Sequence, residues 1–166
     1  EYIVFGSGGS RDIPEGFSRS EARRQFIDLC SQMAPIASKY DVVVVLEPLN
    51  TKECNFINSV TEGGEIVEAV NHPNFRLLAD FYHMLMDGEK PESIEKYGHL
   101  IQHTHIAEKE GRAAPGTHND DFTAYFKALK DAGYKGMLSI ECRWEDMEAQ
   151  AASANETMKN QLLTLK

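Results

Sequence analysis

Four consecutive valines and a leucine, Val42 to Leu46, constrain the fold of this chain more than any other stretch. A half-exposed strand alternates apolar and polar residues, whereas a continuous β-branched run is typical of a strand buried on both faces, as in a parallel sheet covered by helices. The run ends in Glu47, which predicts a carboxylate at the carboxyl end of a buried strand. Sites in α/β proteins gather at that end of the sheet.

Three later apolar runs also end in a side chain that can bind a metal, namely Asp80, His105 and Glu141. Counted from Glu47, the successive spacings are 33, 25 and 36 residues, and each matches about one strand–helix repeat. Because parallel strands end at the same edge of a sheet, the four side chains are expected at one site. Three carboxylates and one imidazole form an oxygen-rich set that suits Mn²⁺, Mg²⁺ or Co²⁺ better than a closed structural zinc site.

The remaining pattern alternates strands with helices and contains no hairpin signal, which predicts an α/β fold with parallel, right-handed crossovers. Serines followed three residues later by glutamate, at Ser18 and Ser59, predict helix starts with capping boxes. Residues 1–166 are expected to form a single domain. The expected strands are 2–5, 42–47, 77–84, 100–107 and 137–141. The strand 2–5 is also expected to be buried. The expected helices begin at Ser18, Ser59, Pro91, Asp120 or Asp121, and Asp146.

Composition excludes some classes of partner. The formal net charge of −9 argues against a nucleic-acid partner, which requires a basic surface. No run approaches the ~18 apolar residues of a membrane span, so no membrane partner is expected. Three widely spaced cysteines favour a reducing compartment, and a cytoplasmic protein is expected.

The segments around the four side chains resemble the xylose-isomerase-like TIM-barrel family, which includes ketose 3-epimerases, inosose and hydroxypyruvate isomerases, and endonuclease IV. The resemblance implies a TIM (β/α)8 barrel, of which this chain holds about five strand–helix units, the fourth to the eighth. The barrel would then be completed by a second copy, in a homo-oligomer, or by another chain segment. The segments that carry the resemblance are Leu46–Asn50, Asp80–Met84, His103–Glu108 and Ser139–Glu141.

The resemblance also implies roles for individual residues. Glu47, Asp80, His105 and Glu141 would bind one divalent ion, with Mn²⁺ expected first and Mg²⁺, Co²⁺ or Zn²⁺ as alternatives. Glu47 and Glu141 would also act as the acid/base pair. Substrate contacts would come from His83, Glu53 and Arg112, although Arg112 lies one residue later than in the epimerase pattern.

This chemistry is coherent without the family. Moving a proton on a carbon next to a carbonyl requires a base and a group that stabilises the developing enediolate, and a divalent ion supplies the second. The expected function is therefore a divalent-metal-dependent isomerase or epimerase whose small-molecule substrate is a sugar or keto-polyol.

Two alternatives stay open. One is a truncated barrel that serves as a binding or interface module without turnover. The other is an endonuclease IV-like zinc phosphodiesterase, which is disfavoured because His118 and Asp120 occur in the reverse of the order that family uses for its extra zinc.

Overall fold

The chain folds around a five-stranded parallel sheet with the strand order β1-β2-β3-β4-β5. The structure is a computed structural model that describes residues 1–165. Since each strand lies beside its sequence neighbour, every connection crosses over the same face of the sheet. The predicted α/β class is confirmed. The strands are β1 (Tyr2–Phe5), β2 (Val43–Leu46), β3 (Phe75–Asp80), β4 (Ile101–Ile106) and β5 (Leu138–Ile140).

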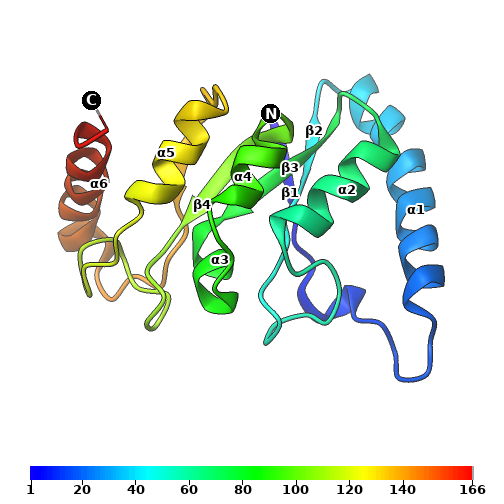
Figure 1. Cartoon of the computed structure of the whole chain (residues 1–166), viewed down its shortest axis with the longest axis horizontal. Helices are drawn as coiled ribbons and strands as arrows, with labels where there is room; N and C mark the ends of the chain where they lie inside the picture. The colour runs from blue at the N-terminus through cyan, green and yellow to red at the C-terminus, as the bar shows by residue number, and fades with distance from the viewer. Residues whose placement is uncertain (166) are drawn as a thin grey trace.

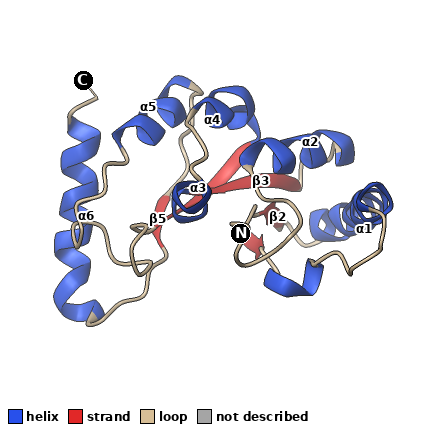
Figure 2. Cartoon of the chain, turned by 60° about the horizontal axis from the view of Figure 1, so that its bottom comes forward, coloured by secondary structure: helices blue, strands red, loops and turns tan. Residues whose placement is uncertain are grey.

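The helices cover one side of the sheet (Figure 1). In Figure 2 most of them lie along an arc with the strands on its inner side, as in part of a barrel wall. The helices are α1 (Arg19–Lys39), α2 (Val60–Val70), α3 (Phe81–Asp87), α4 (Glu92–Tyr97), α5 (Thr123–Asp131) and α6 (Met147–Leu163), with short 3₁₀ turns at Gly8–Arg11 and Gly98–Leu100.

Side-chain caps fix where several helices begin. The hydroxyls of Ser18 and Ser59 accept hydrogen bonds from the backbone N–H groups three residues later, so both predicted helix starts are confirmed. The expected continuation of β3 as a strand to Met84 is wrong, because the residues after Asp80 form α3. The Asp80 carboxylate accepts a hydrogen bond from Tyr82 N and so caps this short helix.

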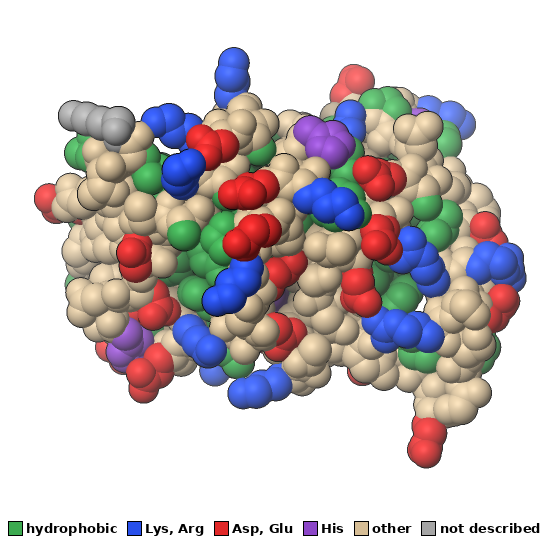
Figure 3. Space-filling view, in the orientation of Figure 1, with side chains coloured by type: hydrophobic (Ala, Val, Ile, Leu, Met, Phe, Trp, Pro, Cys, Tyr) green, Lys and Arg blue, Asp and Glu red, His purple; other side chains and the backbone are tan. Residues whose placement is uncertain are grey.

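The core lies between the sheet and the outer helices. Phe81 stacks on Tyr125 with ring centroids 4.9 Å apart and contacts Phe126 at 5.8 Å, which ties the start of α3 to α5. Each fully buried aromatic or aliphatic side chain stabilises such a core by roughly 1.5–3 kcal/mol. The outer face carries interspersed acidic and basic side chains over the helices (Figure 3).

Both edge strands of the sheet lack a second neighbour within residues 1–165: β1 pairs only with β2, and β5 only with β4. The expected burial of β1 is therefore wrong: Tyr2, Ile3 and Val4 are 37%, 55% and 41% exposed. Met137, which precedes β5, is also exposed. Unpaired edges with exposed apolar side chains are the signature of an incomplete barrel. No helix among the described residues has both the length and the apolar character that a membrane crossing requires.

Candidate metal centre

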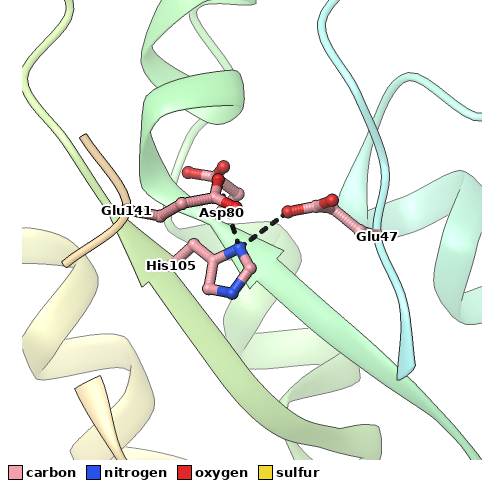
Figure 4. Close-up of side chains that lie close together, drawn as sticks. All are labelled: Glu47, Asp80, His105 and Glu141. Atoms are coloured by element: carbon pink, nitrogen blue, oxygen red, sulfur yellow. Dashed lines mark hydrogen bonds and ion pairs between the residues drawn. The ribbon is translucent and has the colours of Figure 1, made fainter. Parts of the chain in front are cut away.

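Four side chains meet where the strands end. Glu47 follows β2, Asp80 is the last residue of β3, His105 is the penultimate residue of β4, and Glu141 follows β5. Each offers one potential ligand atom, and these atoms all lie within 4.8 Å of one another (Figure 4). The structure thus brings together the four residues singled out in the sequence.

The parallel register accounts for this convergence. Asp80 of β3 lies directly beside His105 of β4, so both side chains occupy one level of the inner face. The backbone N–H of Glu141 donates to Ile106 O at 3.1 Å, and that of Glu47 donates to Phe5 O at 3.2 Å. Both glutamates are therefore fixed by ladder hydrogen bonds one residue beyond their strands.

Charge pairing organises the cluster internally. His105 Nδ1 lies 2.9 Å from Glu47 Oε1 and 3.5 Å from Glu141 Oε2. The guanidinium of Arg112 donates to Glu141 Oε2 and lies 3.3 Å from Asp80 Oδ2. One imidazole and one guanidinium thus offset part of the charge of the three carboxylates.

Two groups of the cluster, Asp80 and His105, have raised pKa values. Burial, together with the charge of Glu47, raises the pKa of Asp80 to about 7, although Arg112 and His105 act in the opposite direction. Burial also opposes the charged form of His105, but the hydrogen bond and charge of Glu47 outweigh it and raise the pKa of this imidazole. A cation among these donors would favour the ionised carboxylates, and their chemistry fits a hard divalent ion.

The three residues predicted to contact substrate surround the cluster. His83 is buried, and its Nε2 lies 3.4 Å from Asp80 Oδ2. Its Nδ1 accepts from the backbone N–H of Asn50 at 3.2 Å, so the neutral ring carries its hydrogen on Nε2, facing Asp80. Burial lowers the pKa of His83 and favours that neutral form. Glu53 is more peripheral: it accepts from Asn50 Nδ2 at 3.0 Å and lies 4.0 Å from His83 Nδ1.

Two residues that position Glu47 were missed by the sequence reasoning. Gly6 follows β1, and a Cβ placed there would lie 2.4 Å from Glu47 Oε2, so this glycine leaves room for the carboxylate. Arg11 is a buried cation whose guanidinium donates to four backbone carbonyls, including Glu47 O at 2.8 Å. In the sequence, the glycines after β1 were the signal that the backbone there approaches another group closely. Nothing in the sequence connects Arg11 to these carbonyls.

Glu108 also lacked a predicted role, although it lies in the same segment as His105. Its carboxylate is fully buried and accepts hydrogen bonds from the backbone N–H groups of Gly116, His118 and Asp120. It therefore fastens residues 109–120, which contain Arg112, to the end of β4. The signal for Glu108 in the sequence was its position three residues after His105.

The other histidines lie outside the cluster. His103 is buried one layer below His105, with ring centroids 5.1 Å apart, and its Nδ1 has no hydrogen-bond partner among residues 1–165. His118 lies 3.8 Å from Glu110, while Asp120 accepts from Lys109 N at 2.6 Å. The pair His118 and Asp120 thus belongs to the loop and is not brought to the four-residue site.

Residues 1–162 match the family model described as xylose isomerase-like TIM barrel, and the chain belongs to that family. It is 32% identical over 127 residues to L-ribulose 3-epimerase of Methylomonas sp. (strain DH-1), covering 76% of this chain and 44% of that protein. It is 29% identical over 153 residues to inosose isomerase of Bacillus subtilis (strain 168), covering 85% and 55%.

Solved structures give the same result. The D-allulose 3-epimerase of Methylomonas sp. in complex with D-allulose superposes with a TM-score of 0.81 at 28% identity, over 90% of this chain and 58% of that one. The predicted partial TIM barrel is therefore confirmed. The chain spans about half the length of the curated relatives it matches.

Proposed function

We propose that this chain is the metal- and substrate-binding part of a divalent-metal-dependent isomerase or epimerase that acts on a sugar or keto-polyol. The observation that carries the proposal is the meeting of three carboxylates and one imidazole at the ends of four neighbouring strands. The names of the relatives, an L-ribulose 3-epimerase and an inosose isomerase, support the same class of substrate.

Glu47 and Glu141 are the proposed acid/base pair. They approach the cluster from different strands and lie on either side of His105 in Figure 4. A substrate carbon held between them can lose a proton to one carboxylate and receive one from the other, and each such transfer contributes ~10²–10⁴-fold. Glu47 is buried while the Glu141 side chain is 48% exposed, so Glu141 can exchange its proton with solvent more readily.

The metal is proposed to be held by Glu47, Asp80, His105 and Glu141, with Mn²⁺ favoured by the oxygen-rich donor set. When bound, it supplies electrostatic stabilisation of negative charge on the substrate oxygens. His83 contributes a neutral Nε2–H donor at the same site, while Glu53 and Arg112 are proposed to contact substrate hydroxyls at its rim.

The test is exchange of the substrate's α-proton with solvent. D-Allulose, L-ribulose and hydroxypyruvate, incubated in D₂O with the Mn²⁺-loaded full polypeptide that carries this chain, should show deuterium incorporation by NMR for at least one compound. Glu141→Gln should abolish the exchange while the melting temperature is kept. The matched control is Glu148→Gln on the exposed start of α6, which should exchange like the parent protein. Undiminished exchange in Glu141→Gln would remove this residue from the acid/base role.

A binding or interface module without turnover is the second candidate, favoured by the two open sheet edges within residues 1–165. In either case we propose that another chain segment or a second copy completes the barrel. Saturable metal and sugar binding without proton exchange in the completed assembly would favour the module. We also propose a cytoplasmic location, because the three cysteines are all free thiols.

A further inference from the structure

Arg112 reaches into the metal centre from the loop after β4. Its Nη2 donates to Glu141 Oε2 and lies 3.3 Å from Asp80 Oδ2, and its Nε donates to Glu141 O at 3.3 Å. Its guanidinium carbon lies 4.7 Å from the centre of the Tyr82 ring, within the range of a cation–π contact. The side chain is only 20% exposed, so this position is well defined by its neighbours.

The backbone around Arg112 is built to hold this position. Gly111 and Arg112 both have positive φ values, 66° and 53°, and for a non-glycine residue that conformation is uncommon. The carbonyl of Arg112 accepts from Arg143 N at 2.8 Å, which ties the loop to the chain just after Glu141. Together with the buried Glu108 carboxylate, this fixes the loop at both ends.

Arg112 therefore uses two of the four side chains proposed to bind the metal. A divalent ion held by the full set would share Asp80 and Glu141 with the guanidinium, and two cations on the same carboxylates repel each other. The other two side chains of the set, Glu47 and His105, are hydrogen-bonded to each other. The protein's own cationic groups thus compensate part of the cluster's negative charge.

We propose that Arg112 is the internal counter-cation of this site, which competes with the metal and releases its guanidinium from Asp80 and Glu141 when the metal binds. After release, the guanidinium keeps its cation–π contact with the Tyr82 ring and can bind a substrate oxygen. Substrate would therefore bind productively only after the metal. This inference rests on the metal-dependent function proposed above, which it deepens by giving the order of binding.

Metal affinity is the direct test, measured by titration calorimetry with MnCl₂ on the full polypeptide at mildly alkaline pH. Removing the competing cation in Arg112→Ala should tighten Mn²⁺ binding about tenfold, since charge-assisted hydrogen bonds to two carboxylates no longer have to be broken. Arg143→Ala is the matched control: it removes the same charge one loop away, keeps the backbone N–H, and should leave the affinity unchanged. If Arg112→Ala does not fold, Arg112→Gln keeps most of the stem without the charge.

A second readout separates charge from loop structure. Methylguanidinium added to Arg112→Ala should occupy the vacated place and weaken Mn²⁺ binding again, while it leaves the parent protein unaffected. Equal or weaker Mn²⁺ binding in Arg112→Ala would overturn the inference. So would tighter binding that methylguanidinium does not reverse, because the loop would then be responsible. Absence of saturable Mn²⁺ binding in the parent protein would instead refute the proposed function itself.

Discussion

Replacing Gly6 with alanine should weaken metal binding through a single methyl group. The new Cβ would lie 2.4 Å from Glu47 Oε2, whereas ordinary contacts between such atoms are at least 3.4 Å, so the carboxylate has to retreat by about 1 Å. Metal–ligand distances tolerate only about 0.2 Å. Glu47 is buried and hydrogen-bonded to His105, so it cannot recover this distance without breaking that contact.

The expected loss is about 10- to 100-fold in Mn²⁺ affinity, the range typical of disturbed neighbours of metal ligands, or roughly 1.4–2.7 kcal/mol. Gly9→Ala is the matched control, because Gly9 lies three residues later, in the 3₁₀ turn Gly8–Arg11, and its Cβ would only touch Asp12 Oδ2, at 3.3 Å. Neither glycine has a positive φ, so the backbone accepts alanine at both positions. Calorimetry should show weaker binding for Gly6→Ala alone. Equal affinity in the two variants would refute the close-approach argument.

Three further predictions concern protonation, the loop and the sheet edges. In the metal-free protein the pKa of Asp80 is raised to about 7 and the pKa of His105 is also raised. Mn²⁺ affinity should therefore fall as pH drops below about 7. Metal binding should also release protons, which calorimetry in two buffers of different ionisation enthalpy measures. The raised pKa values of Asp80 and His105 contribute stability to the metal-free fold that is lost as pH rises through about 7. The melting temperature should therefore fall more between about pH 5 and about pH 8 in the parent protein than in Asp80→Asn, and an equal fall in both would contradict these shifts. Glu108→Ala leaves three backbone N–H groups without their acceptor, which costs ~1–3 kcal/mol of folding free energy for each group that stays buried. Amide hydrogen exchange at Gly116 and His118 should therefore accelerate, and Glu108→Gln should show a smaller change. Finally, residues 1–166 expressed alone should self-associate through β1 and β5 in sedimentation experiments, and a monodisperse monomer with cooperative melting would count against an incomplete barrel.

The sequence predicted the features that depend on short-range patterns. The run from Val42 to Leu46 indicates a buried strand by itself, and Ser18 and Ser59 cap their helices through contacts only three residues long. Asp80 shows where such reasoning fails. The aromatic residues after it favour a strand, but the Asp80 carboxylate caps the backbone and starts α3.

The remaining errors and omissions are long-range. The burial of β1 depends on a neighbouring strand and not on its own residues, so its apolar sequence could not reveal that it lies exposed at an edge. Arg11 meets Glu47 O and Phe56 O across 36 and 45 residues of chain, and no spacing rule connects them. The four-residue cluster could be predicted from the sequence only because parallel strands bring their carboxyl ends to the same edge of the sheet.

The way in which Glu108 holds its loop has an evolutionary consequence. All three of its hydrogen bonds go to main-chain N–H groups, which every residue except proline provides. The side chain of His118 can therefore be exchanged without unfastening the loop. Asn119 is less free, because its φ of 64° favours asparagine or glycine. Variation can accumulate beside the candidate metal centre while the backbone path, and with it the placement of Arg112, is inherited unchanged. Side chains beside the candidate metal centre can thus change by point mutation without rebuilding the loop.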